Sequence, residues 1–404
     1  MNLISFILPS RNNLKYLKQA YESIRKNSEH QHEICIASDA STDGTVEWVQ
    51  EIMKKDENVK LHINEGPERL GHTILYDTLV YEYATHDRVM IFHADMYLCP
   101  NADEEIDKLL EPGKVVSLTR IEPPLHPDGP EKVLCDFGIE PEEFDEEGLL
   151  EWINQWRKGE DKYTDGIFAP WCIMKDDFTR IHGHDPLFAP QSKEDSDIFN
   201  RFMLAGYEFI QTWQGYVYHM TCRGSRFKDG AKRNPDGQVF MKNRESDEWL
   251  KQNMRSTRNF IRKWGSMVVH NEYLKPIIPP KYDIGLVIEN CTAEILELLE
   301  PYCNQVYLKD DKLFQPYLDK EQQNCRYDLG AKLVTLDIKP FNDIIIHFDA
   351  SKLNNDNYQK IFLNFPRILE ESGEPNENFE LDIFAIKIKN LDNQVDTLVN
   401  SVCK

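Results

Sequence analysis

The stretch VMIFHADMYLCP, residues 89–100, begins with a run of apolar residues and changes abruptly at His93, Ala94 and Asp95. A short apolar run that stops at polar side chains predicts a buried β-strand. In an extended backbone His93 and Asp95 lie on the same face, so the imidazole and the carboxylate would point the same way. Nitrogen and oxygen ligands without a thiolate favour Mn²⁺ or Mg²⁺ over a structural zinc ion. The stretch therefore predicts a ligand or metal site at the end of a strand, although a His-x-Asp pair alone is not specific for such a site.

The segments before this strand alternate between strand and helix patterns. The expected strands are LISFIL (3–8), EICIAS (33–38), VKLHIN (59–64) and RVMIFHA (88–94), with helices between them, the third over about 70–84. This order predicts an α/β fold with a mostly parallel sheet that helices cover on both faces. Ligands of such sheets bind beyond the carboxyl ends of the strands. The residues at those ends are Pro9, Ser10, Arg11, Ser38, Asp39, Asn64, Glu65, His93, Ala94 and Asp95.

Two segments near residue 200 add candidate site residues. SKEDSDIFNRFMLAGYEFI (192–210) predicts a helix over about 193–205, in which Ser192 and Asp195 have the spacing of a capping box. Glu194 and Asp195 in its first turn either only complement the helix dipole, or are held ionised by it and ready to accept a proton. GYVYHM (215–220) predicts a strand closed by His219, which is either a structural histidine or a ligand from a third element.

The order of these segments resembles the family 2 glycosyltransferases of the GT-A fold, over about residues 2–222. FILPSRNNLKYLKQAYESI (6–24) is similar to the opening strand, turn and first helix of that family, and SDASTDGT (38–45) to its DDxSxDGT loop. HAD (93–95) stands at the place of its DxD motif, and KEDSDIFNRFMLAGYEF (193–209) is similar to its EDxDLxxRxxxxGY helix. The resemblance implies a Rossmann-like domain that binds a nucleotide sugar.

The resemblance also implies roles for individual residues. Asp95 and His219 would hold the divalent cation, Mn²⁺ or Mg²⁺, that bridges the donor diphosphate. Asp195 would be the general base that deprotonates the acceptor hydroxyl, with Glu194 beside it. Asp39 would accept the imino proton of a uracil or guanine base. The residues expected around the nucleotide are Pro9, Ser10, Arg11, Asp39, His93 and Ala94.

Several positions depart from the family pattern. His93 replaces the first Asp of DxD, which puts its contact with a ribose in doubt, and Ser38 replaces the first Asp of the loop. Arg11 stands where Tyr is common and is placed to reach a phosphate. GHTILYD (71–77) replaces the usual GxSxARN, so the nucleotide contacts of this segment are open.

The implied activity is metal-dependent transfer of a sugar from a UDP- or GDP-linked donor to a hydroxyl acceptor, with inversion. One alternative is a nucleotidyltransferase, which needs a Gly-rich basic signature after the first strand, whereas PSRNNLKYL (9–17) contains no Gly. The other alternative is a non-catalytic carbohydrate-binding protein with the same fold. The presence of Asp95, Asp195 and His219 counts against a decayed site. The sugar, the acceptor and the oligomeric state are left open by the sequence.

The loop RGSRFKDGAKRNPDG (223–237) is basic in a chain that is otherwise acidic. One interpretation is a solvated surface loop. The other is a lid that closes over the donor, in which Arg223 and Arg226 bind phosphate oxygens, because a guanidinium group pairs bidentately with them.

The pattern along the chain suggests three parts. Residues 1–235 form the expected catalytic domain, residues 236–278 a helical connector, and residues 279–404 a small α/β domain of unknown role. The pair Pro279-Pro280 marks the last boundary. The final part contains no Gly-rich phosphate loop, so we expect it to position an acceptor or a partner.

The overall composition limits the class of partner. Lys and Arg number 47 against 69 Asp and Glu, a formal charge of −22, which argues against binding nucleic acid through its phosphates. Nine cysteines without a CxxC or other paired spacing are typical of reduced thiols in the cytoplasm. The first apolar run is only six residues long and is interpreted as a strand rather than a signal peptide. No apolar run reaches membrane-spanning length.

Overall fold

The computed structural model of this chain describes residues 2–28, 30–156, 162–221, 230–241 and 245–402. The chain divides into two compact units, each with its own sheet. The first unit contains Met1–Asn253 and His270–Pro276, and the second contains Met254–Val269 and Ile277–Lys404.

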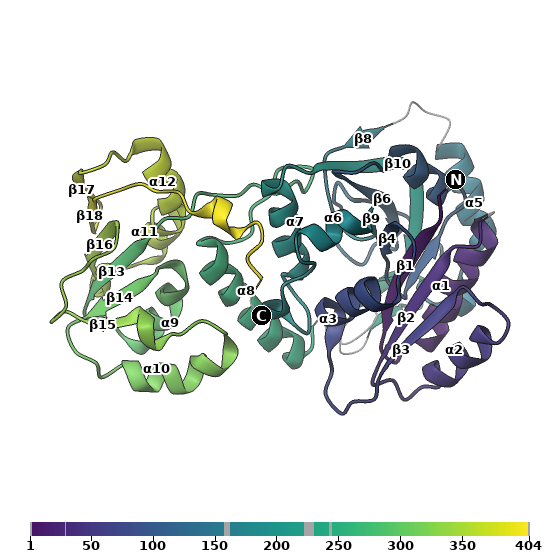
Figure 1. The fold of residues 1–404 in the computed structure, drawn as a ribbon, viewed down its shortest axis with the longest axis horizontal. Helices are drawn as coiled ribbons and strands as arrows, with labels where there is room; N and C mark the ends of the chain where they lie inside the picture. The colour runs from purple at the N-terminus through teal and green to yellow at the C-terminus, as the bar shows by residue number, and fades with distance from the viewer. Residues whose placement is uncertain (1, 29, 157–161, 222–229, 242–244, 403–404) are drawn as a thin grey trace. The chain divides into compact units, whose positions relative to one another are not determined.

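The first unit is built on a ten-stranded, mostly parallel sheet (Figure 1). Along the sheet the order is β3-β2-β1-β4-β9-β6-β10-β5, with β7 beside β6 and β8 beside β10. The strands are β1 (Ile4–Ser10), β2 (Glu33–Asp39), β3 (Val59–Asn64), β4 (Arg88–Ile91), β5 (Met96–Leu98), β6 (Lys114–Glu122), β7 (Lys132–Leu134), β8 (Tyr163–Thr164), β9 (Trp171–Met174) and β10 (Glu208–His219). The predicted α/β fold with a mostly parallel sheet is therefore confirmed.

Helices cover both faces of this sheet, which explains why its central strands are continuous apolar runs. Phe6 and Leu8 of β1 pack on one side in a core that includes Leu17, while Ile7 packs on the other side in a core that includes Leu75. The helices are α1 (Leu14–Asn27), α2 (Thr45–Met53), α3 (Gly71–Thr78), α4 (Ala102–Leu109), α5 (Glu146–Trp156), α6 (Lys175–Arg180) and α7 (Glu194–Leu204). Helix α8 (Asp247–Trp264) begins in this unit and belongs to the second unit from Met254 onward. A π-helical turn at Leu79–Tyr83 continues α3, so the helical segment matches the predicted 70–84. A short hairpin is formed by β11 (Ala231–Arg233) and β12 (Val239–Met241).

The predicted capping box at the start of α7 is wrong. The residue before the helix is Lys193, and no side chain caps it. Ser192 and Lys193 both have left-handed backbones, with φ of 79° and 71°. This conformation takes the Ser192 side chain away from the helix end, and its hydroxyl group lies 2.7 Å from Oδ1 of Asn253 instead.

Two strand pairings bring distant residues to one edge of the sheet. The turn between β4 and β5 contains His93 and Asp95 and is closed by a hydrogen bond from Met96 N to His93 O. Strand β10 runs antiparallel to β5, with His219 opposite Met96. Its next residue, Met220, donates its backbone N–H to the carbonyl oxygen of Asp95. The end of β10 is thereby fixed beside the β4–β5 turn.

The second unit is a smaller α/β sheet in the order β15-β14-β13-β16-β18-β17. Its first four strands in this order are parallel and the last two pairings are antiparallel. The strands are β13 (Ile284–Glu289), β14 (Gln305–Leu308), β15 (Leu333–Thr335), β16 (Ile344–Asp349), β17 (Asn378–Leu381) and β18 (Phe384–Ile388). The helices are α9 (Ala293–Leu299), α10 (Phe314–Glu321), α11 (Asn355–Lys360) and α12 (Phe365–Ser372). A buried ion-pair group joins Arg262 to Glu300 and Glu321.

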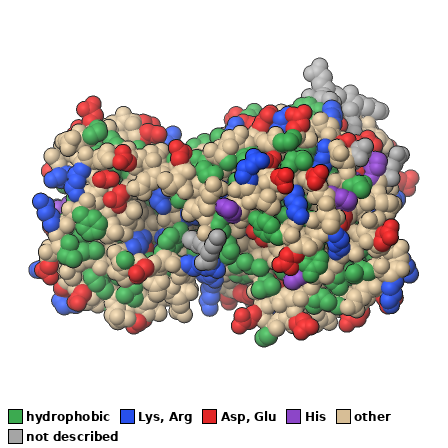
Figure 2. Space-filling model, viewed as in Figure 1, with side chains coloured by type: hydrophobic (Ala, Val, Ile, Leu, Met, Phe, Trp, Pro, Cys, Tyr) green, Lys and Arg blue, Asp and Glu red, His purple; other side chains and the backbone are tan. Residues whose placement is uncertain are grey.

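On the face drawn in Figure 2, acidic and basic side chains of the described residues are interspersed rather than gathered by sign. Among the described residues, no helix combines the length and the apolar character that crossing a bilayer requires. The described cysteines are all free thiols.

Candidate active site

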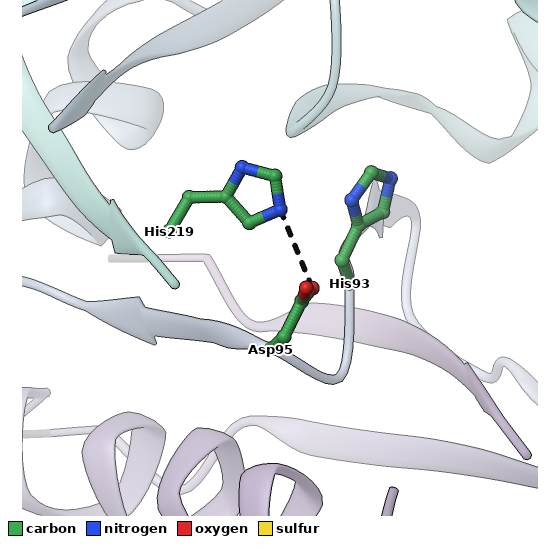
Figure 3. Close-up of side chains that lie close together, drawn as sticks. All are labelled: His93, Asp95 and His219. Atoms are coloured by element: carbon green, nitrogen blue, oxygen red, sulfur yellow. Dashed lines mark ion pairs between the residues drawn. The ribbon is translucent and has the colours of Figure 1, made fainter. Parts of the chain in front are cut away.

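His93, Asp95 and His219 lie together at the edge of the first sheet (Figure 3). Nε2 of His219 is 3.4 Å from Oδ1 of Asp95, and the rings of His93 and His219 are 5.6 Å apart between centroids. One nitrogen or oxygen atom from each residue lies within 4.8 Å of the others. The structure thus adds the imidazole of His93 to the two residues that were expected to hold a metal ion.

His219 is held from behind by Glu122, the last residue of β6. Its Nδ1 atom lies 2.7 Å from Oε1 of Glu122. Strand β6 runs parallel to β10 and pairs Ile121 with Tyr218, so the next residues of the two strands lie side by side. Glu122 was not predicted from the sequence. The signal for it was a carboxylate at the end of a strand-like segment (VVSLTRIE, 115–122), as for Asp95.

Glu122 is a buried carboxylate surrounded by cations. Nε of Arg120 is 3.1 Å from its Oε1 atom, and Nζ of Lys132 is 3.2 Å from its Oε2 atom. Burial alone would raise the pKa of Glu122, but Arg120, His219 and Lys132 together hold this pKa well below its usual range. Glu122 is therefore ionised at neutral pH, so it accepts a hydrogen bond and Nδ1 of His219 must carry the proton.

The two imidazoles of the cluster have opposite protonation tendencies. Burial lowers the pKa of His93 to about 3, and nearby His219 contributes in the same direction. Burial also tends to lower the pKa of His219, but the carboxylates of Asp95 and Glu122 outweigh burial and raise this pKa to about 9. His93 thus offers a free lone pair at neutral pH, whereas a cation that binds Nε2 of His219 competes with a proton.

A cavity of about 710 Å³ opens over this cluster. The predicted site residues that line it are Pro9, Ser10, Arg11, His93, Ala94, Asp95, Glu194, Asp195 and His219. Residues that line it without having been predicted include Arg69, His72, Tyr76, Arg120, Glu122, Lys132 and Gln191. The two predicted phosphate-binding arginines, Arg223 and Arg226, lie outside the described residues. The structure therefore brings most of the predicted site into one cavity.

Asp39 has a different position from the rest of the predicted site. It is buried at the end of β2 and is absent from the described lining of the cavity. Its carboxylate accepts hydrogen bonds from the backbone N–H groups of Leu70 and Gly71, at 3.0 and 2.9 Å, and from the side-chain amide of Asn64 at 2.8 Å. These contacts tie the start of α3 to the sheet, and a contact of Asp39 with a nucleotide base stays a prediction.

The expectation that the helix dipole holds the acidic pair of α7 ionised is wrong in direction. Glu194 is buried, and its Oε2 atom has no hydrogen-bond partner among the described residues. Burial, together with the charge of neighbouring Asp195, raises the pKa of Glu194 to about 8. Burial also raises the pKa of Asp195. Desolvation thus outweighs the dipole, and the pair retains a proton over much of the neutral range.

Two aromatic residues of α3 complete the wall of the cavity. The ring of His72 stacks on His93 with centroids 6.3 Å apart. Tyr76 is buried, and its pKa is raised well above its usual value by burial and then by Asp195, Glu194 and Asp95. Tyr76 therefore lies within electrostatic range of both the metal-binding candidates and the acidic pair.

Comparison with known proteins relates part of the chain to a family. The model of Glycosyl transferase family 2 matches residues 5–155. No curated protein matches the chain. The chain is similar in fold to the mannosyltransferase PcManGT from Pyrobaculum calidifontis, solved with GDP-Man and Mn2+, at 17% identity and a TM-score of 0.39, covering 55% of this chain and 58% of that one.

Two further solved structures are similar at the same level. GalNAc-T7, solved with UDP, GalNAc and Mn2+, has 12% identity and a TM-score of 0.45, covering 94% of this chain and 60% of that one. TarS 1-349 of S. aureus has 14% identity and a TM-score of 0.37, covering 54% of this chain and 60% of that one. The present chain thus aligns with about three fifths of the length of each of these structures.

The family match contains the first four strands of the sheet, the turn with His93 and Asp95, and Glu122. Glu194, Asp195 and His219 lie beyond its end and are joined to it by the fold. Residues 5–155 of the first unit are therefore similar to glycosyl transferase family 2.

Proposed function

We propose that this chain is a metal-dependent glycosyltransferase that moves a sugar, with inversion, from a UDP- or GDP-linked donor to a hydroxyl acceptor. The observation that carries the proposal is the meeting of His93, Asp95 and His219 in a cavity that also contains Asp195. The family 2 domain at residues 5–155 supports the reaction class.

The donor set of the cluster suits a divalent cation. Two imidazole nitrogens and one carboxylate oxygen, all close together, are appropriate ligands for Mn²⁺. Imidazole is a poorer ligand for Mg²⁺, which prefers oxygen, so we expect Mn²⁺ to be the better activator. A bound cation would stabilise the charge that develops on the leaving diphosphate. His93, Asp95 and His219 would hold it.

The acidic pair of α7 supplies the proton acceptor of the proposed reaction. Both residues line the cavity, but Asp195 is only half-buried, whereas Glu194 is almost fully buried. Asp195 is therefore the carboxylate that an acceptor hydroxyl can reach. Its raised pKa brings it closer to the operating pH, which favours proton transfer from the hydroxyl group in the transition state. In an inverting reaction this base acts on the side of the sugar opposite the diphosphate.

The nucleotide is assigned to the end of β1. Ser10 is buried, and its hydroxyl group has no hydrogen-bond partner among the described residues, so it is available to a ligand. Arg11 follows it at the cavity wall and brings a positive charge to an acidic protein. Arg223 and Arg226 are proposed as further phosphate contacts. The cytoplasmic location and the absence of nucleic-acid binding stay predictions from composition.

The test is nucleoside diphosphate release from a panel of UDP- and GDP-sugars with candidate acceptors, with Mn²⁺ and after chelation. Metal-dependent release of UDP or GDP supports the proposal. Release of pyrophosphate from a sugar phosphate and a nucleoside triphosphate would identify a nucleotidyltransferase instead. Binding of sugars without release of a nucleoside diphosphate or pyrophosphate would identify a non-catalytic carbohydrate-binding protein.

A further inference from the structure

We propose that Glu122 is a positioning residue for the cation of this site: by holding Nδ1 of His219, it directs Nε2 of the same ring toward the metal ion. This inference rests on the proposed metal site and adds a residue that was not predicted from the sequence.

The geometry of His219 supports this role. One ring nitrogen faces Glu122 at 2.7 Å and the other faces Asp95 at 3.4 Å. Glu122 also faces the cations Arg120 and Lys132, so its carboxylate acts as an acceptor toward Nδ1, and Nε2 is the ring nitrogen that faces the cluster and is left to bind a cation. A carboxylate behind a metal-binding imidazole fixes both the tautomer and the orientation of the ring, and makes the ring a stronger ligand.

The position of Glu122 is itself fixed. The residue is 1% exposed, and its two oxygen atoms face Arg120 and Lys132. The backbone hydrogen bond between Met220 and Asp95 fixes the strand end that carries His219. His219, Glu122 behind its ring and Asp95 in front of it therefore have little conformational freedom. A metal ligand must be held in such a fixed geometry.

A purely structural role is the competing explanation, because Glu122 also neutralises Lys132, which is buried, and Arg120, which is partly buried. The chain offers a matched control for this role. Oε1 of Glu131 lies 3.0 Å from Arg120 and 3.4 Å from Lys132, so Glu131 serves the same cations. It makes no contact with His219 among the interactions that the structure describes. Glu131→Gln therefore removes a negative charge beside Arg120 and Lys132 but leaves the contact between Glu122 and Nδ1 of His219 in place.

The experiment measures Mn²⁺ binding by the full chain without nucleotide or acceptor, using the electron paramagnetic resonance signal of free Mn²⁺. The proteins compared are the wild type, Glu122→Gln, Glu131→Gln and Asp95→Ala. We expect Glu122→Gln to raise the Kd for Mn²⁺ about 10–100-fold, as is typical when a carboxylate behind a metal-binding histidine is removed. Glu131→Gln should stay within about threefold of the wild type. Circular dichroism melts check that each variant is folded.

The outcomes separate this inference from the proposed function. Equal Kd values for Glu122→Gln and Glu131→Gln, with a large loss in Asp95→Ala, would overturn the role of Glu122 and leave the metal site intact. A wild type that binds Mn²⁺ no better than Asp95→Ala would overturn the metal site itself. If Glu122→Gln does not fold, Glu122→Asp replaces it, because it keeps the charge but withdraws the carboxylate by one methylene from Nδ1. The Kd for Mn²⁺ of Glu122→Asp is then compared with that of Glu131→Gln in the same way, and equal values would overturn the role of Glu122.

Discussion

Nε2 of His219, at the end of β10, lies 3.4 Å from the carboxylate of Asp95 in the turn after β4. The contact joins a residue inside the family 2 match to one beyond it. It exists because β10 pairs antiparallel to β5, which follows the turn directly. The consequences of this contact for metal binding and catalysis can be measured separately.

Asp95→Ala should abolish the effect of Mn²⁺ on nucleotide binding. In the wild type, calorimetry should show that UDP or GDP binds more tightly with Mn²⁺ than after chelation, because a cation offsets the repulsion between the diphosphate and an acidic protein. The variant should bind equally weakly in both conditions. Asp311→Ala, which changes an exposed carboxylate in the second unit, serves as the control. Equal affinity of the wild type with and without Mn²⁺ would contradict the prediction.

His93→Asp should change the preference between cations. The substitution replaces an imidazole with a carboxylate, which is a better ligand for Mg²⁺. The ratio of nucleotide release with Mn²⁺ to that with Mg²⁺ should fall relative to the wild type. An unchanged ratio, in a variant that still binds nucleotide, would show that His93 does not bind the cation.

Asp195→Asn should abolish transfer and leave donor binding almost unchanged. An amide cannot accept the proton of the acceptor, and loss of a general base typically lowers the rate by about 10²–10⁴. Calorimetry of UDP or GDP with Mn²⁺ should give the wild-type affinity, while single-turnover transfer shows the loss. If Glu194→Gln shows the large loss and Asp195→Asn does not, the base is Glu194.

Glu194→Gln should flatten the pH dependence of stability. The pKa of Glu194 is raised from 4.5 to about 8 in the folded protein, so between these values the folded state retains a proton that the unfolded chain releases. The free energy of unfolding should therefore fall as pH rises from about 5 to about 8. Thermal melts across this range should show a smaller decline for Glu194→Gln than for the wild type or for Glu57→Gln, which alters an exposed residue. Parallel declines in all three proteins would show that Glu194 does not bind the extra proton.

Gly71→Ala should destabilise the first unit more than an ordinary loop substitution does. Gly71 has φ of +77°, and a Cβ atom there would lie 2.0 Å from the carbonyl oxygen of Pro190. Gly113 has a similar φ of +84° but no atom within 4 Å of such a Cβ. Gly113→Ala therefore measures backbone strain alone, about 1 kcal/mol or more. Urea unfolding should give a clearly larger loss for Gly71→Ala, and equal losses would exclude the close contact.

The sequence determined the first four strands with the helices between them, helix α7 and the edge at which the site lies. Apolar periodicity is a local property, and the carboxyl ends of parallel strands must meet at one edge, so His93 and Asp95 could be predicted to lie at that edge, although their spacing alone did not identify a site. The acidic pair of α7 and His219 were predicted as candidates because each stands at the end of an element with a clear pattern, and the family resemblance suggested their roles.

The tertiary structure determined the contact partners, the pKa values and the tautomers of those residues. Glu122 reaches His219 only because β6 pairs with β10, and no local pattern encodes that pairing. The pKa of Glu194 rises because its surroundings exclude water, an effect that exceeds the helix dipole and that depends on neighbours from other elements. Asp39 is held by the backbone of Leu70 and Gly71, which the fold brings to the end of β2. Residue type and spacing can be read along the chain, whereas desolvation, tautomer and contact partners are set by residues that are distant in sequence and close in space.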